Sequence, residues 1–223
     1  MIVAIDGTTG SGKSGLCKRV CKELNFKYIR SSSFYRAIAY KMLCNNINKD
    51  DLAQVKQLLK TTNIQYDYNN EHVVLTMDGT DVSDKLNTPE VSDYVSKIAS
   101  ISDVRKHVRK LQKQSAKNHK NIVMEGRDIG SVIFPNADLK IYMDCDINVR
   151  AERRVKQYAK NGIKVSLQKA KQAIAQRDLE DTTRHDSPLI RLPEAFYLDT
   201  TNLSMEECVN IVIQQIKLKQ AKK

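Results

Sequence analysis

The residues whose types and spacing most clearly indicate a chemical role lie near the start of the chain. Residues 7–14 read GTTGSGKS and match G-x-x-x-x-G-K-[ST] at every fixed position. Glycines let backbone N–H groups curve around a phosphate, the lysine can bridge phosphate oxygens, and the serine hydroxyl can ligate Mg²⁺. An apolar run at 2–5 precedes the motif, and apolar residues with helical spacing follow it over 14–25. This context predicts a loop that binds a nucleoside triphosphate.

A second set of residues that could take part in chemistry consists of single arginines, several of them close to acidic residues in the sequence. They are Arg36 after Tyr35, Arg127 beside Asp128, and the set Arg177, Asp178, Asp181 and Arg184. An enzyme that transfers a phosphoryl group between two anionic nucleotides needs several cations around both and little covalent chemistry. The pattern therefore favours phosphoryl transfer.

Apolar periodicity predicts the elements that position these residues. Strands are expected at 2–5, 26–29, 122–124, 139–143 and 196–198, and helices at 14–25, 34–44, 50–60, 147–160, 166–180 and 205–218. Alternating strands and helices at both ends of the chain indicate a parallel sheet covered by helices. In the middle, two β-like runs (64–68 and 72–77) and the Asp78-Gly79 turn signal predict a small antiparallel sheet, and 90–118 predicts a long basic helical region.

Composition narrows the class of protein. The chain has 223 residues, 41% hydrophobic and 28% charged, which argues against wholesale disorder. No apolar run approaches the roughly 20 residues that span a bilayer, and the first run is too short for a signal peptide. Five cysteines without a CxxC pair or metal-ligand spacing indicate reduced thiols, so we expect a cytoplasmic protein without a membrane partner.

The formal net charge of +11 favours polyanionic partners, although the lysines are spread over the whole chain. One stretch, 104–124, contains no acid and seven basic residues: Arg105, Lys106, Arg109, Lys110, Lys113, Lys117 and Lys120. It could be a solvated helix face or a polynucleotide-binding surface. The stretch has no aromatic residue, which argues against stacking on single-stranded nucleic acid.

At these residues the sequence resembles the bacterial cytidylate kinases, a branch of the P-loop nucleoside monophosphate (NMP) kinases. The resemblance covers nearly the whole chain, including DGTDVS at 78–83, TPEVSDYVSKIA at 88–99, GRDIGSVIFPNADLKIYMD at 126–144, RDLEDTTRHDSPL at 177–189 and LDTTNLSMEE at 198–207. It implies transfer of the γ-phosphate of ATP to CMP or dCMP with Mg²⁺, by a monomer. It also implies an α/β fold with a three-layer parallel β-sheet P-loop core (1–30 and 119–223), a helical lid (about 150–166), and an NMP-binding region (31–118) with an antiparallel insert (about 62–87).

The resemblance also implies roles for individual residues. ATP would contact Gly7, Thr8, Thr9, Gly10, Ser11, Gly12, Lys13, Ser14, Gly15, Arg150, Arg153 and Arg154. CMP would contact Ser31, Tyr35, Arg36, Ser96, Arg105, Arg127, Asp128, Arg177, Asp181 and Arg184. Within this set Arg36, Arg127 and Arg184 match phosphate-binding arginines, Ser96, Arg105 and Asp128 match cytosine contacts, and Arg177 and Asp181 match ribose contacts. Lys13, Arg127, Arg154 and Arg184 would be catalytic. Ser14 would ligate Mg²⁺, with Glu125 acting through water or orienting Arg127.

The chain departs from the family pattern at four positions. Arg30 and Ser32 replace the usual Asp and Gly on either side of Ser31, Glu125 replaces an Asp, and Thr8 replaces a Pro. Several roles also have structural alternatives. Arg105 could belong to the solvated basic face, Asp178 could pair with a lysine or cap its helix, and Tyr35 could pack rather than touch substrate.

Other functions remain open at this point. Another small-molecule P-loop kinase, such as a UMP kinase, would share the loop but leave the Ser96, Arg105 and Asp128 set unexplained. A P-loop protein that binds nucleic acid through 104–124 is a second alternative. A GTPase would need a guanine-reading NKxD-type segment after a strand, and none of the predicted strands is followed by one.

Overall fold

The computed structural model describes residues 1–69, 72–117, 119–160 and 162–221. The chain forms two compact units: unit 1 comprises Met1–Tyr28 and Asn121–Lys223, and unit 2 comprises Ile29–Lys120. The functional division predicted from the sequence, into 1–30 with 119–223 and 31–118, remains a prediction.

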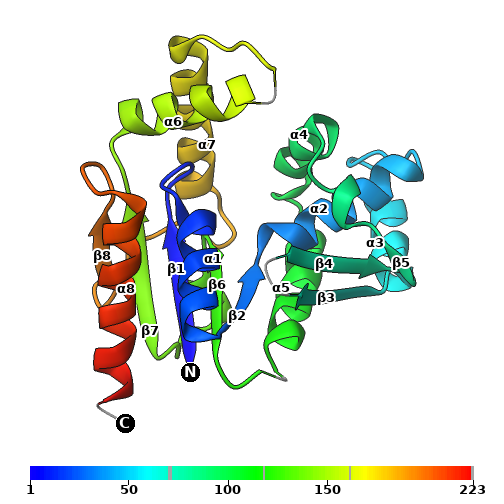
Figure 1. Cartoon of the computed structure of the whole chain (residues 1–223). Helices are drawn as coiled ribbons and strands as arrows, with labels where there is room; N and C mark the ends of the chain where they lie inside the picture. The colour runs from blue at the N-terminus through cyan, green and yellow to red at the C-terminus, as the bar shows by residue number, and fades with distance from the viewer. Residues whose placement is uncertain (70–71, 118, 161, 222–223) are drawn as a thin grey trace. The chain divides into compact units, whose positions relative to one another are not determined.

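Unit 1 is built on a parallel sheet with the strand order β2-β6-β1-β7-β8 (Figure 1). The strands are β1 (Ile2–Gly7), β2 (Lys27–Arg30, which crosses the unit boundary), β6 (Ile122–Gly126), β7 (Leu139–Asp144) and β8 (Phe196–Asp199). Ile5 of β1 lies beside Glu125 of β6 and Ile141 of β7. The central strand is apolar and buried, as expected of a parallel strand covered on both faces.

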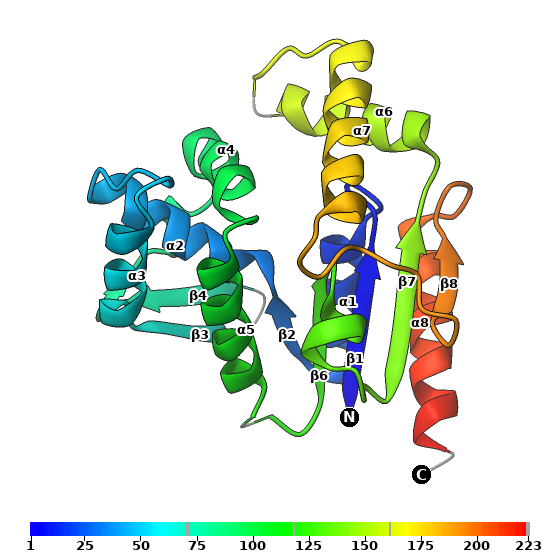
Figure 2. The same cartoon turned by 180° about the vertical axis from the view of Figure 1, so that it is seen from behind.

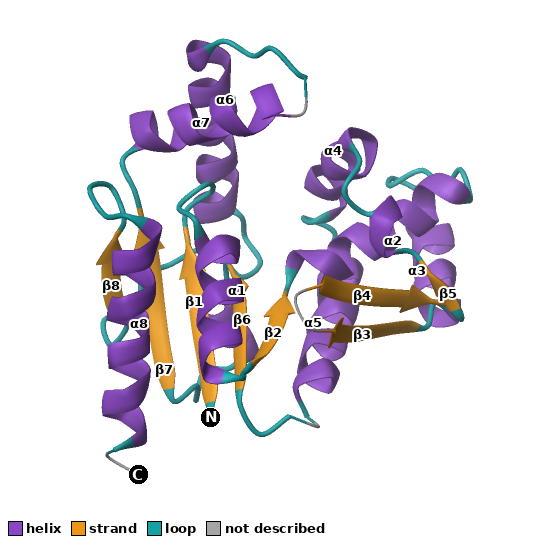
Figure 3. Ribbon diagram, viewed as in Figure 1, coloured by secondary structure: helices purple, strands orange, loops and turns teal. Residues whose placement is uncertain are grey.

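Helices cover this sheet and extend beyond it. Helices α1 (Lys13–Leu24) and α8 (Met205–Gln220) pack together on one face (Figure 3), and a π-helical turn (Ile129–Ile133) lies on the other (Figure 2). Helices α6 (Ile147–Lys160) and α7 (Leu167–Thr183) pair beyond the carboxyl ends of the strands (Figure 1). They share a small apolar cluster that includes Ala151, Ala170 and Ile174. This arrangement gathers the segments that follow β1, β6 and β7 at one edge of the sheet.

Unit 2 combines helices with a separate antiparallel sheet of order β3-β4-β5. Its elements are α2 (Ser32–Cys44), α3 (Leu52–Thr61), β3 (Ile64–Asn69), β4 (His72–Met77), β5 (Thr80–Asp81), α4 (Pro89–Ile98) and α5 (Ser102–Ala116). The parallel sheet and the small antiparallel sheet confirm the predicted α/β class. The long helical region expected over 90–118 is helical but consists of two helices, because α4 ends at Ile98 and the extended residue Ile101 precedes α5; residue 118 lies outside the described residues.

Two further expectations concern the chain as a whole. All five cysteines are free thiols, and Cys17 and Cys21 are buried on the inner face of α1. Among the described residues, none of the helices is both long and apolar enough to span a membrane.

Candidate active site

The phosphate-binding loop joins the carboxyl end of β1 to α1. Gly7 lies so close to β7 that a Cβ atom on it would be 2.0 Å from the carbonyl oxygen of Met143. Gly12, just before α1, has a left-handed φ of 96°, which a side chain would strain. The structure thus explains two fixed glycines of the motif: Gly7 approaches β7 closely, and Gly12 has a left-handed backbone conformation.

Lys13 begins α1, and its side chain folds back over the loop. It is 5% exposed, and Nζ donates to the carbonyl oxygens of Gly7 (2.8 Å) and Thr8 (2.6 Å) and to Oγ of Ser11 (3.3 Å). Burial lowers the pKa of Lys13 from 10.5 to about 7, and the nearby charge of Arg127 acts in the same direction. Phosphate oxygens at this loop would instead favour the charged ammonium.

Ser14 is linked to the end of β6. Its hydroxyl donates to Oε1 of Glu125 at 2.7 Å, and the same oxygen accepts the hydroxyl of Tyr28 at 3.0 Å. Glu125 is 6% exposed. A hydroxyl beside a carboxylate offers the oxygen ligands that Mg²⁺ prefers, so the two residues fit a magnesium site.

Two unusual loop residues have a structural explanation. Thr8, where the family pattern has proline, donates its N–H to the carbonyl of Met143 (3.1 Å), a bond that proline cannot make. Its hydroxyl donates to Oδ1 of Asp144 at 3.0 Å, which ties the loop to β7. Gly15 lies against α8, where a Cβ would be 3.3 Å from Cε of Met205. A glycine therefore lets Met205 pack close to the loop.

Asp6, just before the loop, holds the turn that follows β6. It is 7% exposed, and its carboxylate oxygens accept the N–H groups of Ile129 (2.8 Å) and Gly130 (2.7 Å). Burial raises the pKa of Asp6 from 3.8 to about 6, although these two bonds act in the opposite direction. Because Asp128 directly precedes the turn, Asp6 fixes the backbone that carries this predicted base-reading carboxylate.

Four predicted acceptor residues of unit 1 form one linked cluster. Nε of Arg127 donates to Asp181 at 2.7 Å, and Nη1 of Arg184 donates to the same carboxylate at 3.4 Å. Nη2 of Arg184 lies 3.9 Å from Oδ2 of Asp128. These side chains are only 10–20% exposed. The structure thus brings together two predicted phosphate-binding arginines with carboxylates that hold them.

Arg177 lies on α7 close to this cluster. Burial lowers the pKa of Arg177, and the charge of Arg127 adds to the effect. A third partly buried cation here adds to the positive potential that an anionic ligand would relieve.

The three arginines of α6 have different surroundings. Arg150 is 6% exposed and binds groups outside α6. Arg153 donates to the carbonyl of Thr200 at 2.8 Å. Arg154 instead donates to Gln157 of its own helix at 3.2 Å. Of these predicted ATP-binding arginines, Arg150 and Arg153 thus anchor α6 in unit 1, whereas Arg154 interacts within the helix.

The remaining predicted CMP-binding residues lie in unit 2. Nη1 of Arg36, on α2, donates to the carbonyl of Leu86 (2.8 Å) and to Oγ of Ser92 (3.0 Å). Arg105, on α5, is 1% exposed and donates to the carbonyl of Ala99 at 3.1 Å. These contacts join α2 to α4 and to the segment before it, and α5 to the residue that follows α4.

Arg105 does not belong to the solvated basic face of α5. Lys106, Lys110 and Lys113 are exposed, whereas Arg105 is buried and lies 6.0 Å from the ring centroid of Tyr35. The alternative of a solvated Arg105 is therefore wrong. Tyr35 makes at least a packing contact.

The two predicted serines of unit 2 differ in exposure. Ser31 is buried immediately before α2, and its carbonyl accepts a bond from Gln112 at 3.5 Å. Ser96 is exposed on α4. Of these two serines, only Ser96 therefore offers an exposed side chain.

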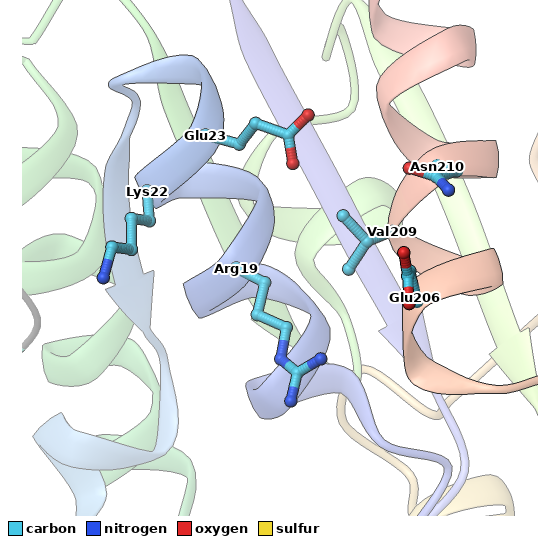
Figure 4. A pocket seen from close by; sticks show the side chains of 6 residues that line it. All are labelled: Arg19, Lys22, Glu23, Glu206, Val209 and Asn210. Carbon is cyan, nitrogen blue, oxygen red and sulfur yellow. The ribbon is translucent and has the colours of Figure 1, made fainter.

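A surface pocket of about 550 Å³ lies elsewhere in unit 1, between α1 and α8 (Figure 4). It is lined by Arg19, Lys22, Glu23, Glu206, Val209 and Asn210. None of the predicted site residues lines it, and its charged side chains have both signs, so it shows no preference for an anion.

Sequence reasoning missed Asp6, Tyr28 and Asp144, and left Asp178 as a helix-capping or pairing residue. Asp178 instead accepts the N–H of Thr9 in the loop at 3.0 Å. Of these residues, only Asp6 and Asp144 could have been identified from the sequence. Both lie at the ends of strands, where the ligands of parallel sheets bind.

A parallel sheet with a Gly-rich phosphate loop after its central strand, and arginine–carboxylate groups at the same edge, defines a P-loop kinase. Solved structures share this fold. They include an uncharacterized protein from Eubacterium ventriosum (TM-score 0.54, 13% identity, covering 97% of this chain and 98% of that one) and a gluconokinase from Sinorhizobium meliloti (TM-score 0.50, 13% identity, covering 98% and 93%).

Sequence comparison identifies the family. The cytidylate kinase family model matches residues 3–218. The chain is 40% identical to the cytidylate kinase of Fusobacterium nucleatum, covering 97% of both proteins. It is 37% identical to that of Mycoplasma capricolum, covering 97% of this chain and 96% of the relative. The chain belongs to the cytidylate kinase family.

Proposed function

We propose that this protein transfers the γ-phosphate of ATP to CMP or dCMP, giving ADP and CDP or dCDP. The observation that carries the proposal is the pairing of two features at one edge of the sheet. The loop with Lys13 suits the triphosphate, and the linked cluster around Arg127 and Asp181 suits a second anion. Phosphoryl transfer needs cations on both sides of the moving group, and unit 1 supplies both sets.

On the donor side, the phosphates would be held by Lys13 and by backbone N–H groups of residues 7–15 other than those of Thr8 and Thr9, which bond to Met143 and Asp178. Lys13 binds the carbonyls of its own loop, and with ATP bound it would exchange these neutral partners for phosphate oxygens. Arg154, with its partner on its own helix, is the α6 arginine that we expect to reach ATP. Charge stabilisation by such groups is typically the largest contribution to catalysis.

Ser14 would ligate Mg²⁺, and Glu125 would hold the serine hydroxyl or a magnesium-bound water. Bound with ATP, the ion neutralises phosphate charge. Glu125 is one methylene longer than the usual aspartate, and it spans the distance to Ser14 directly at 2.7 Å.

On the acceptor side, Arg36, Arg127 and Arg184 would bind the phosphate of CMP, and Arg177 and Asp181 would bind the ribose. The salt bridge of Arg127 with Asp181 supports this division, because it orients a guanidinium that keeps further N–H groups for a ligand. Ser31, just before α2, and Tyr35, on α2, would also contact CMP.

Cytosine would be read by Ser96, Arg105 and Asp128. Its 4-amino group donates, and its N3 and O2 accept, so a carboxylate and two donors complement it. Uracil carries a carbonyl in place of the amino group, and that carbonyl would face the carboxylate of Asp128 as a second acceptor. Unpaired polar groups of this kind are a strong source of discrimination.

We further propose that the enzyme acts as a cytoplasmic monomer and that 150–166 serves as a lid over ATP. Free thiols at all five cysteines are consistent with a reducing compartment. The shared apolar cluster would keep α6 packed against α7 while the rest of the lid closes.

A coupled ADP-release assay with ATP and a panel of CMP, dCMP, UMP, AMP and GMP tests the function. We expect turnover with CMP and dCMP and much slower turnover with UMP. Preferred use of UMP or AMP would contradict the proposed acceptor, while the loop assignment would stand.

A further inference from the structure

Three residues from three segments of unit 1 form a closed hydrogen-bonded ring. Asp178 of α7 accepts the backbone N–H of Thr9 at 3.0 Å and also binds Nη1 of Arg150. Nη1 of Arg150 in turn donates to the carbonyl oxygen of Thr9 at 3.1 Å. The backbone of one loop residue is thus held on both its N–H and its C=O, and a single carboxylate joins the two contacts.

The ring is buried. Thr9 is 4% exposed and Arg150 is 6% exposed, while the side chain of Asp178 is 18% exposed. A guanidinium in such a position needs a carboxylate partner, because an unpaired buried charge is strongly unfavourable. Arg150 has a further bond, from Nε to the carbonyl of Cys145 at 2.7 Å, which fixes its orientation. Asp178 therefore completes a network that cannot be satisfied without it.

The same loop residue also holds a predicted catalytic arginine. Oγ1 of Thr9 accepts Nη2 of Arg127 at 2.8 Å, and Nε of Arg127 donates to Asp181. Asp178 and Asp181 are three residues apart on α7 and hence on one face of the helix. One carboxylate holds the loop and the other holds the arginine, and Thr9 links the two.

We propose that Asp178, on α7, is a positioning residue that holds the phosphate-binding loop and Arg127 in their relative positions. It does not touch the reacting atoms. Its carboxylate fixes the backbone of Thr9, and Thr9 in turn fixes Arg127. This gives Arg150 an anchoring role, in which its charge balances Asp178. The inference rests on the proposed function only in assigning ATP to the loop.

The test compares Asp178→Asn with Glu180→Gln, which removes the same charge from an exposed site on the same helix. Glu180 binds Gln176 at 2.8 Å and takes no part in the ring. Binding of a non-hydrolysable ATP analogue is measured by calorimetry without acceptor, and kcat and KM are measured with CMP. Loss of a charged hydrogen bond predicts about 10-fold or more weaker analogue binding and a lower kcat for Asp178→Asn. Glu180→Gln should match the wild type, and the CMP-to-UMP ratio should not change in either variant.

A double-mutant cycle with Arg150→Met separates positioning from general damage. Because the two residues act through one ring, the double variant should bind the analogue about as weakly as either single variant. The proposal would be overturned if the affinity losses of the two single variants multiplied in the double variant. It would also be overturned if Asp178→Asn bound the analogue as tightly as Glu180→Gln does. If Asp178→Asn does not fold, Arg150→Lys, which keeps the charge but lacks the forked donor, should still show the weaker analogue binding, and unchanged binding would reject the ring.

Thr9→Val tests the hydrogen bond by which Thr9 holds Arg127. It keeps both backbone contacts of the ring but loses the acceptor for Arg127, so analogue affinity should be kept while kcat falls. An unchanged kcat would refute the link to Arg127. Since analogue binding needs no acceptor, a wild-type protein that binds the analogue but fails to phosphorylate CMP would contradict the proposed function and leave the assignment of Asp178 intact.

Discussion

The phosphate-binding loop of unit 1 and the arginines of unit 2 are organised in different ways. In the loop, Lys13 bonds to Gly7, Thr8 and Ser11, all within six residues of it. In unit 2, Arg36 reaches Leu86 and Ser92, which are 50 and 56 residues away in the sequence. One arrangement is local, and the other exists only after tertiary packing.

The difference shows which part of the chemistry each region can encode. A phosphate is recognised by backbone N–H groups and one cation, which a short contiguous segment supplies. A base is recognised by separate donors and acceptors around its edge, so its readers must come from several elements. Phosphate binding should therefore fail when single loop residues change, and base selection should fail separately.

Lys13→Ala should cause the largest loss. Removing a charge-stabilising group costs about 3 kcal/mol or more, so turnover should fall by about two orders of magnitude or more with every acceptor. Lys18→Ala, an exposed lysine of the same helix, serves as the control in the ADP-release assay. Near-normal turnover of Lys13→Ala would remove the loop from the donor site.

Arg36→Ala should damage CMP and UMP turnover alike, because we assign Arg36 to the phosphate that both nucleotides share. The expected loss in kcat/KM is about 10- to 150-fold, the range for a hydrogen bond to a charged group. Lys106→Ala provides an exposed control in the same unit. A change in the ratio of the two kcat/KM values would mean that Arg36 reads the base.

Asp128→Ala should lower the ratio of kcat/KM for CMP over UMP, chiefly by raising KM for CMP, by up to about 10- to 150-fold. The ratio is the deciding quantity, because Asp128 also lies 3.9 Å from Arg184 and its loss affects both substrates through that contact. If Asp128→Ala kept full CMP preference while Arg36→Ala lost it, our division of these residues into base-reading and phosphate-binding groups would be wrong.

This contrast also explains what the sequence could predict. The loop, the strand before it and the helix after it follow from contiguous residues, and so does the hairpin of β3 and β4, which pairs Ile64 with Met77. The break between α4 and α5 was missed, because residues 99–101 carry neither glycine nor proline. Helical spacing continues across it, and only packing separates the two helices.

The supporting residues of the site were missed for a related reason. Asp6 binds the N–H of Ile129, 123 residues away, and Asp178 binds that of Thr9, 169 residues away. A carboxylate that accepts a backbone N–H leaves no pattern at the partner, since any residue offers that N–H. Such contacts become visible only in the folded chain.

The smallest expected effect is a proton taken up with ATP. Burial lowers the pKa of Lys13 from 10.5 to about 7, so before ATP binds its side chain should be mostly neutral at pH 8. Phosphate oxygens beside Nζ raise this pKa, because they favour the charged form. At pH 8 the ATP analogue should therefore draw close to one proton from the buffer, and at pH 6, where Lys13 is already charged, it should draw little through this group.

Calorimetry of analogue binding in buffers with different ionisation enthalpies measures this uptake directly. Lys13→Arg is the matched control, because arginine stays charged throughout this pH range and has no proton to gain. The difference between wild type and Lys13→Arg at pH 8 thus isolates Lys13. Equal uptake in both would assign the proton to another group and contradict the expected gain of a proton by Lys13. CMP should give no such difference, since we assign it to residues other than Lys13, so proton uptake marks the loop and not the acceptor residues of unit 2.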